Sequence, residues 1–172
     1  MARRFVVAVI GTGHEAEPLV SNARELGRRI AEQGWVLISV GRDSGVMKAA
    51  NGGAKEAKDS LTIGILPNPT ADVSPDVDVA IVTDTGEARN NIIVLSADLI
   101  IACGASDAGT ASEVALAIKN GKHLIMLEAS DEAKKFFGAM SGDQMTFAES
   151  PDDAIRFVKE WFAGWSGSEH RL

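Results

Sequence analysis

Cysteine is nearly absent from the sequence, since one residue, Cys103, occurs among 172. A single thiol excludes an internal disulfide framework and indicates a reducing compartment, which predicts a cytoplasmic protein. Cys103 ends an apolar run that is typical of a buried strand. We therefore expect it to be a small buried hydrophobic residue and not a reactive thiol.

An excess of positive charge is also lacking, because 24 acidic residues outnumber 17 basic ones and leave a formal net charge of -7. Binding to nucleic acid needs a basic surface, so the composition argues against a nucleic acid partner. A small phosphorylated ligand is still compatible, because two or three local arginines can hold it. The three histidines do not show the spacing of a metal site with carboxylates or cysteines, and we expect no metal.

Long apolar runs are missing as well, and no apolar segment is long enough to span a bilayer. The run Phe5–Ile10 follows two arginines, but it breaks at Gly11–Gly13 and lacks the features of a signal peptide. The sequence therefore predicts no membrane contact. Its length predicts one domain, residues 1–172, that is large enough to bury a core.

Short apolar runs alternate with segments of helical periodicity along the chain. We expect a long loop at 68–78 that crosses the sheet edge and a fraying tail at 165–172, while the segment 130–140 stays ambiguous. The expected strands cover 5–10, 35–40, 61–66, 79–83, 98–103, 122–127 and 144–148, and the expected helices cover 18–33, 46–58, 87–96, 110–120 and the segment from 151.

This alternation predicts an α/β fold: a Rossmann-like, three-layer α/β/α arrangement around an open, mostly parallel sheet of about seven strands. Such sheets bind ligands beyond the carboxyl ends of their strands. Glycine-rich loops at 11–13, 41–45 and 104–109 each follow a predicted strand. The three loops should therefore meet at one edge of the sheet, where we expect the functional site.

The loop Gly104–Gly109 leads into a predicted helix start, and helix starts bind anions through unpaired amide groups. Gly109 would let a phosphate approach the amides of Gly109, Thr110 and Ala111, with the Thr110 hydroxyl as a further donor. The alternative is a turn without a ligand, in which Thr110 and Glu113 form a capping box. The spacing alone leaves Glu113 open between a structural and a chemical role.

Two arginines could complete a phosphate site. Arg42 lies in the loop Gly41–Gly45, before a second helix start, and its guanidinium suits bidentate contact with phosphate. Arg89 precedes the apolar half of a short predicted helix. The alternatives are a solvated loop arginine at position 42 and a surface Arg–Glu pair at position 89.

Three segments together resemble the LOG (Lonely Guy) and lysine-decarboxylase-like superfamily: Gly41–Met47, the segment around Arg89, and Gly109–Glu113. The resemblance extends from about Phe5 to Phe162. Within the superfamily, the chain is most similar to the branch that contains molybdenum cofactor carrier proteins. The stretches that carry this closer similarity are 54–57, 62–67, 88–90 and 111–117.

LOG enzymes are phosphoribohydrolases, which release a base from a nucleoside 5′-monophosphate, and in their motif an arginine acts together with a glutamate. The resemblance implies that the matching positions here are Arg89, Gly109, Thr110 and Glu113. A glutamate beside the ribose could stabilise the positive charge that develops when the N-glycosidic bond breaks.

The sequence departs from the LOG motif in two places. Gly104–Asp107 replaces a glycine pair, with Cys103 or a neighbour at the position of a proline, and Glu87–Asn90 replaces a Met-x-x-Arg-Lys stretch. These departures retain a phosphate site and favour binding over hydrolysis.

We therefore predict a carrier or binding protein for a phosphorylated small molecule, either a nucleoside monophosphate or molybdenum cofactor, that requires no cofactor of its own. The alternative is a LOG-type phosphoribohydrolase with Arg89 and Glu113 as its catalytic residues, and a third interpretation is a regulatory module that senses a nucleotide. The resemblance also implies a homodimer or homotetramer. The predicted ligand-binding residues are Gly11, Thr12, Gly41, Arg42, Ser44, Gly45, Val46, Met47, Arg89, Gly104, Gly109 and Thr110.

Overall fold

The computed structural model describes residues 3–164. Within them, seven strands form one parallel sheet in the order β4-β3-β2-β1-β5-β6-β7, which confirms the predicted fold class. The chain builds outward from β1 in one direction and then in the other, so the strand order reverses beside β1. The strands are β1 (Val6–Gly11), β2 (Val36–Ser39), β3 (Leu61–Leu66), β4 (Val79–Val82), β5 (Leu99–Cys103), β6 (His123–Leu127) and β7 (Met145–Ala148).

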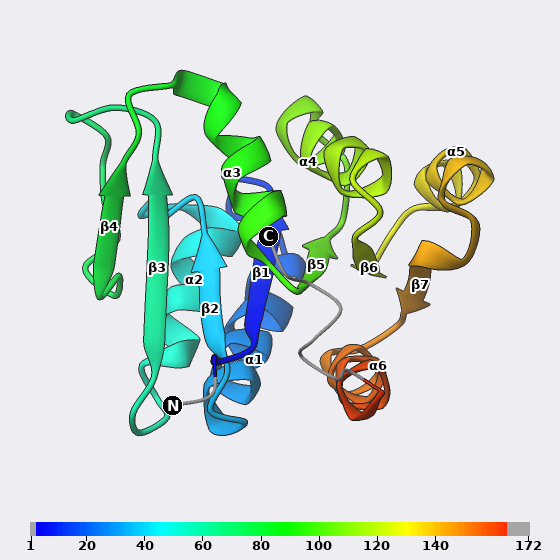
Figure 1. Ribbon diagram of the computed structural model, residues 1–172, viewed down its shortest axis with the longest axis horizontal. Coiled ribbons are helices and arrows are strands. Elements are labelled where there is room, and N and C mark those ends of the chain that lie inside the picture. The colour runs from blue at the N-terminus through cyan, green and yellow to red at the C-terminus, as the bar shows by residue number, and fades with distance from the viewer. Residues whose placement is uncertain (1–2, 165–172) are drawn as a thin grey trace.

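Helices cover both faces of the sheet (Figure 1). On one face α1 packs against α2 and α6, and on the other α4 packs against α3 and α5. Along residues 3–164, no helix has both the length and the apolar composition that crossing a membrane requires. The helices are α1 (Leu19–Glu32), α2 (Gly45–Ala54), α3 (Arg89–Ser96), α4 (Ala108–Lys119), α5 (Asp131–Ser141) and α6 (Pro151–Ala163), with short 3-10 helices η1 (Gly86–Ala88) and η2 (Gly142–Gln144).

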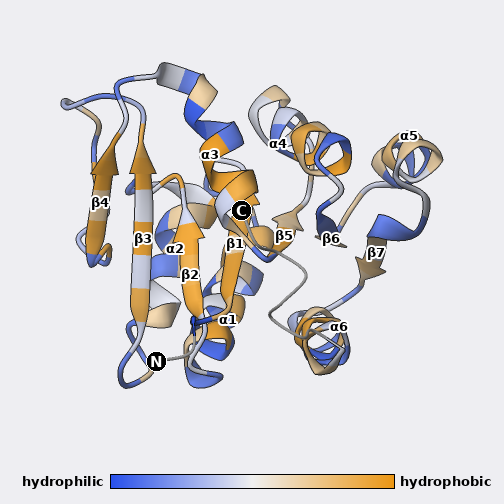
Figure 2. Ribbon diagram, viewed as in Figure 1, coloured by the Kyte–Doolittle hydropathy of each residue, from blue (hydrophilic) through white to orange (hydrophobic). Residues whose placement is uncertain are grey.

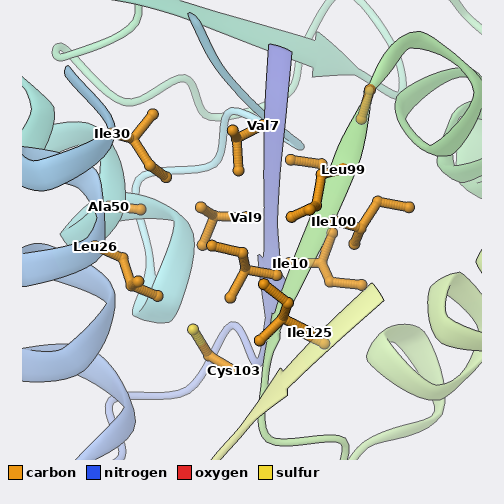
Figure 3. Packing of buried hydrophobic residues seen from close by; sticks show 14 of the residues in the cluster. Val7, Val9, Ile10, Leu26, Ile30, Ala50, Leu99, Ile100, Cys103 and Ile125 are labelled. Atoms are coloured by element: carbon orange, nitrogen blue, oxygen red, sulfur yellow. The ribbon is translucent and has the colours of Figure 1, made fainter. Parts of the chain in front are cut away.

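The core is centred on β1, which has strand neighbours at both edges and helices over both faces. Its parallel register with β5 places Val7 opposite Leu99, and Leu26 and Ile30 of α1 lie against the same strand (Figure 3). A strand that is buried on both faces carries apolar residues at every position instead of alternate ones. The strands are accordingly mostly apolar, although β3 is paler over part of its length, whereas the helices also carry polar residues (Figure 2).

Helices α1 and α2 pack closely because glycines stand at their contact. A Cβ atom at Gly27 would overlap the carbonyl group of Ala50, and one at Gly53 would overlap that of Arg24. The small residues of α2 thus serve the contact with α1, in addition to the contact with the sheet that the sequence predicted. The helix also ends earlier than predicted, at Ala54.

The ambiguous segment 130–140 is the helix α5, whose N-cap Ser130 accepts a hydrogen bond from the amide of Ala133. Ser150 caps α6 in the same way through the amide of Asp153, as predicted. The expected fraying tail, 165–172, lies outside the described residues.

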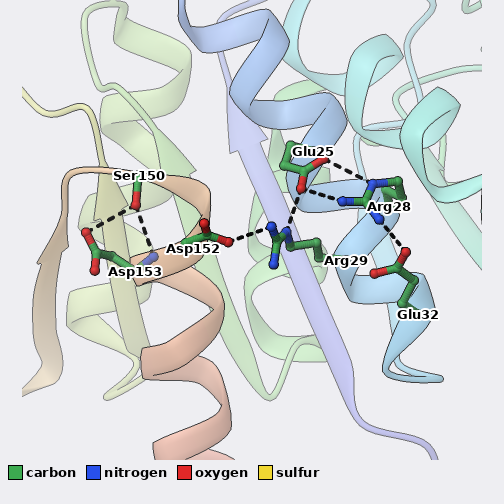
Figure 4. Close-up of polar contacts among 7 residues, drawn as sticks. All are labelled: Glu25, Arg28, Arg29, Glu32, Ser150, Asp152 and Asp153. Carbon is green, nitrogen blue, oxygen red and sulfur yellow. Dashed lines mark hydrogen bonds and ion pairs between the residues drawn. The ribbon is translucent and has the colours of Figure 1, made fainter.

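One ion pair joins α6 to α1, and its arginine belongs to a network of ion pairs along α1 (Figure 4). Arg29 of α1 contacts Asp152 in the first turn of α6 at 2.6 Å, and Glu25 contacts the same arginine at 2.6 Å. Glu25 also pairs with Arg28, so two guanidinium groups lower the pKa of its carboxyl group. These contacts fix the outer helix on the side of the sheet that α1 covers.

The connection from β3 to β4 differs from the prediction, because the loop at 68–78 does not cross the sheet edge. It runs back beside α2, where the Thr62 hydroxyl donates to the carbonyl of Asp76 at 2.6 Å and the Thr62 amide donates to Asp78 at 2.8 Å. These contacts with β3 hold the loop against the sheet in the place of a crossover helix. Strand β4 stays uncovered, and Ile81 and Val82 are 45% and 50% exposed.

Candidate functional site

The three glycine-rich loops lie at the carboxyl edge of the sheet, as predicted. Parallel pairing places Gly11 at the end of β1 opposite Cys103 at the end of β5, and β2 ends beside them at Ser39. The loops after these strands therefore begin side by side. The three loops nevertheless have different surroundings, because each makes different contacts.

The start of α2 is built directly against the loop after β1. The Val46 amide donates to the carbonyl of Thr12 at 3.0 Å, and a Cβ atom at Gly11 would lie 2.7 Å from a methyl group of Val46. Gly45 has a φ of +51°, and a Cβ there would overlap the carbonyl of Thr12. Only glycine fits this backbone conformation and this close approach together. Four predicted residues are thus brought together: Gly11, Thr12, Gly45 and Val46.

The first turn of α2 carries amide donors that the protein leaves unpaired. Its N-cap, Ser44, makes no capping hydrogen bond through its side chain, and the first turn contains no acidic residue. The amides of Gly45 and Met47 have no hydrogen-bond partner within residues 3–164. Unpaired amides at a helix start carry the partial positive charge of the helix dipole, so this end attracts phosphate.

A pocket of about 300 Å³ lies beside this helix start. One side of it is lined by Arg42, Asp43 and Ser44, and the other by the loop after β3, through Pro67, Asn68, Thr70, Ala71 and Asp72. The loop is attached there because the Ser74 amide donates to the carbonyl of Gly41 at 2.9 Å. Sequence analysis missed this wall. The signal that could have found it is its position, directly after a strand that ends at the same sheet edge.

The two predicted arginines meet through a third residue, Glu87. One carboxylate oxygen of Glu87 lies 3.7 Å from Arg42 and 3.2 Å from Arg89. Arg42 is half-exposed, in agreement with a loop arginine, but Arg89 is not part of a surface pair, because its side chain is only 2% exposed. Glu87 therefore sits as an anion between two cations at the site edge, and the sequence analysis did not single it out.

The start of α4 contradicts the sequence prediction. The helix begins at Ala108, and its N-cap is Asp107, not Thr110. The Asp107 carboxylate accepts from the Thr110 amide at 2.9 Å and from the Thr110 hydroxyl at 2.8 Å. The Ala111 amide also donates to the backbone carbonyl of Asp107 at 2.9 Å, so Asp107 occupies two of the three amides that we assigned to phosphate and leaves only that of Gly109. A Cβ atom at Gly109 would lie 3.0 Å from the same carboxylate, so the small residue makes room for Asp107.

Glu113 is consequently not half of a capping box. It is 5% exposed, its Oε1 atom has no hydrogen-bond partner in the described chain, and no ion pair joins it to a cation there. Burial raises the pKa of its carboxyl group to about 8; Arg89 lowers it, while Asp107 and Glu87 raise it further. Glu113 is therefore mostly protonated at neutral pH.

Gly104 faces a second pocket, of about 250 Å³, at the ends of β5 and β6. The structure thus separates Gly104 from Arg42 and Ser44, which line the first pocket. The sequence analysis proposed none of the other lining residues as ligand-binding; they are Glu17, Pro18, Leu19, Ala105, Ser106, Glu128 and Ser130.

Metal and thiol chemistry have no visible basis in the part of the chain that the structure describes. No group of three or more His, Cys, Asp or Glu side chains is placed there to hold a metal ion. Cys103 is fully buried in the core, and burial raises the pKa of its thiol to about 12, as expected of a structural residue.

Comparison with known proteins places this geometry in a family. An uncharacterized protein from Archaeoglobus fulgidus is 37% identical over 151 residues, which cover 88% of this chain and 92% of that protein. The structure of the molybdenum cofactor binding protein from the phototrophic bacterium Rippkaea orientalis is 48% identical, with a TM-score of 0.87 over 93% of this chain and 98% of that one.

The molybdenum cofactor carrier protein from Chlamydomonas reinhardtii is 42% identical, with a TM-score of 0.89 over 94% of this chain and 99% of that one. These likenesses confirm the resemblance to the LOG-like superfamily near its carrier branch. The model of the SLOG cluster4 family matches residues 4–155. The chain belongs to the SLOG cluster4 family.

Proposed function

We propose that the chain binds a phosphorylated small molecule of the molybdopterin type at the carboxyl edge of its sheet and acts as a carrier. The observation that carries this proposal is the open start of α2, which lies beside a pocket of about 300 Å³. The likeness to two proteins described as binding or carrying molybdenum cofactor, along nearly their whole length, supports a phosphorylated pterin as the cargo.

The contacts at this helix start suit the phosphate of such a cargo. The amides of Gly45 and Met47 and the hydroxyl of Ser44 can donate to its oxygens, and Arg42 supplies a cation at the pocket wall. Glu87 is the anion that Arg42 now contacts, so phosphate would replace this carboxylate. The rest of the cargo would extend over the carboxyl ends of the strands.

The hydrolase alternative is less favoured because the chain departs from the LOG motif at Gly104–Asp107 and Glu87–Asn90, and because Glu113 does not offer the carboxylate that direct charge stabilisation uses. Stabilising the positive charge of a breaking N-glycosidic bond needs an ionised carboxylate. Glu113 has a pKa of about 8 and is mostly neutral at pH 7. We expect no release of free base from AMP, GMP, CMP or UMP, as measured by chromatography. Base release that stops in both Arg89→Ala and Glu113→Ala would instead establish hydrolysis.

Direct binding tests the carrier proposal. Protein purified from cells is examined by native mass spectrometry for a bound pterin phosphate, and neopterin monophosphate is titrated by fluorescence. We expect Arg42→Ala to weaken binding about tenfold, since charge-assisted hydrogen bonds contribute roughly 1.5–3 kcal/mol. Arg156→Ala is the matched control, because Arg156 is a similarly exposed arginine on α6. The absence of both co-purified ligand and probe binding would contradict the proposal.

We also propose that the protein forms a homodimer or homotetramer. The exposed apolar residues of β4 and the outward residues Ile92 and Leu95 of α3 support this assembly. An uncovered apolar edge strand is a pairing surface unless a partner protects it. Light scattering of the wild type should give a dimer or tetramer mass, and Ile81→Lys should give a monomer. A wild type that stays monomeric at high concentration would exclude this assembly.

We propose a cytoplasmic location as well. The supporting observation is that Cys103, the one cysteine of the chain, is a buried thiol without a disulfide partner. Cell fractionation followed by immunoblotting tests it, and recovery outside the cytoplasmic fraction would contradict it.

A further inference from the structure

Three buried polar atoms without hydrogen-bond partners occur where α3 and α4 begin. They are Nε of Arg89, Oδ1 of Asn90 and Oε1 of Glu113, and the three residues are between 2% and 5% exposed. The two helix starts contact each other there, because the Asn90 amide donates to the Ser112 hydroxyl at 3.5 Å. Buried polar atoms in proteins are nearly always paired. A group of unpaired ones needs an explanation from function.

The charges around Glu113 favour its neutral form. Arg89 is the cation that acts on it, but Nη1 of this arginine already donates to the carbonyl of Gly86 and to Glu87, both at 3.2 Å. The other charged groups that act on Glu113 are the carboxylates of Asp107 and Glu87. A buried carboxylate with an unpaired oxygen, one engaged cation and two like charges nearby is strongly disfavoured.

A neutral carboxylic acid offers different chemistry from a carboxylate. It presents an O–H donor beside a carbonyl acceptor, whereas the ionised form accepts only. The unpaired Arg89 Nε–H adds a second donor and the unpaired Asn90 Oδ1 a second acceptor at the start of α3, which contacts α4 here. Such donors and acceptors complement a ring edge in which an N–H donor lies next to an acceptor.

We propose that Glu113 binds as a neutral acid and, with Asn90 and Arg89, recognises an uncharged lactam or amidine edge on the ring of the phosphorylated ligand. This inference rests on the proposed binding function. It places the ring of the ligand beside Glu113, Asn90 and Arg89, and the phosphate of the ligand at the start of α2. Glu113 and Asn90 then determine specificity for the ring. Binding weakens as pH rises, because the ionised group loses its donor and repels the ring acceptor.

The test compares wild type with Glu113→Gln, whose amide keeps a donor and an acceptor but cannot ionise. Neopterin monophosphate is titrated by fluorescence from pH 6.5 to 9, and the ratio of the two dissociation constants cancels the titration of the probe itself. At pH 6.5 we expect the dissociation constants of wild type and Glu113→Gln to agree within threefold. At pH 9 we expect the wild type to bind about tenfold more weakly than Glu113→Gln, because only about one tenth of Glu113 is then neutral. Glu149→Gln, at an exposed glutamate, should follow the wild-type profile.

A second readout needs no ligand. In protein labelled with ¹³C at glutamate carboxyl groups, the resonance that is missing from Glu113→Gln should titrate near pH 8 in the wild type. If Glu113→Gln does not fold, Asp107→Asn replaces it. Loss of the neighbouring carboxylate lowers the pKa of Glu113, so the pH at which binding weakens should be lower in Asp107→Asn than in the wild type. A resonance that titrates below pH 6, or a ratio of dissociation constants that stays constant across the pH range, would overturn the inference alone. Failure of wild type and variant to bind the probe at every pH would overturn the proposed function as well.

Discussion

The first turns of α2 and α4 differ, although both follow a glycine-rich loop at the same sheet edge. At α2 the N-cap Ser44 leaves the helix amides unbonded through its side chain, and no acidic residue lies in the first turn. At α4 the N-cap Asp107 bonds the amide and the hydroxyl of Thr110. Each start leaves two amides without a partner in residues 3–164, those of Gly45 and Met47 at α2 and those of Ala108 and Gly109 at α4. The difference is that α4 carries a carboxylate at its N-cap and α2 does not, so an external anion is favoured at α2.

The position of one aspartate relative to the N-cap explains this difference. Asp43 precedes the N-cap of α2, lies 3.4 Å from Lys48 and makes no hydrogen bond to the helix amides in the described residues. Asp107 is itself the N-cap of α4, where a carboxylate accepts from the amide of the third helical residue. A glycine loop followed by a helix is therefore insufficient evidence for a phosphate site.

The largest expected effect concerns the buried acid near the start of α4. The folded protein holds the Glu113 proton up to about pH 8, whereas the usual pKa is 4.5. The resulting stabilisation is complete below pH 4.5 and is lost as pH rises through 8, by on the order of 5 kcal/mol at most. Urea denaturation should show a decline in wild-type stability across this range that Glu113→Gln lacks. An identical pH dependence in both proteins would show that Glu113 is ionised when folded.

The next largest effect is on the free energy of unfolding when the glycine in the first turn of α2 or α4 is replaced. Gly45→Ala places a Cβ atom on the Thr12 carbonyl at a φ of +51° and should cost roughly 3 kcal/mol of folding free energy. Gly109→Ala meets only the Asp107 side chain, which can shift, so we expect a change within about 1 kcal/mol. Thermal or urea denaturation measures both, and equal losses would argue against the difference in packing.

A smaller effect on stability is expected when the two N-cap residues are replaced. Asp107→Ala removes two hydrogen bonds to Thr110 and should cost about 1 kcal/mol, while Ser44→Ala removes no capping bond and should change stability by less than about 0.5 kcal/mol. The Asp107 variant should also lower the pKa of Glu113, because a neighbouring negative charge is lost. A destabilising Ser44→Ala would mean that α2 is capped in solution.

The smallest expected effect on stability concerns Arg42. Its side chain is half-exposed and its contact with Glu87 spans 3.7 Å, so Arg42→Ala should change the free energy of unfolding by less than about 0.5 kcal/mol. Binding of neopterin monophosphate should still weaken about tenfold. A large loss of stability would instead assign Arg42 a structural role at the open helix start.

Sequence analysis predicted the sheet well because its signals are local. Each buried strand is a short apolar run, and each loop glycine marks a strand end. It failed where side chains far apart in sequence decide the outcome. The burial of Arg89 follows from the packing of α3 on α4, and the course of the loop at 68–78 follows from contacts with Thr62. The role of Asp107 is local, and the sequence offered two possible N-cap residues, Asp107 and Thr110, between which spacing alone does not decide.

Glu87 gives the site a competitor that the chain carries itself. Its carboxylate lies between Arg42 and Arg89. In the proposed binding mode, an incoming phosphate therefore exchanges with a carboxylate and does not fill a purely cationic gap. The net binding free energy is then the difference between the contacts that the arginines make with phosphate and those that they make with Glu87. When the ligand leaves, the Glu87 carboxylate can contact the arginines again. For a carrier this arrangement limits how tightly the cargo is held and favours its transfer to a downstream acceptor.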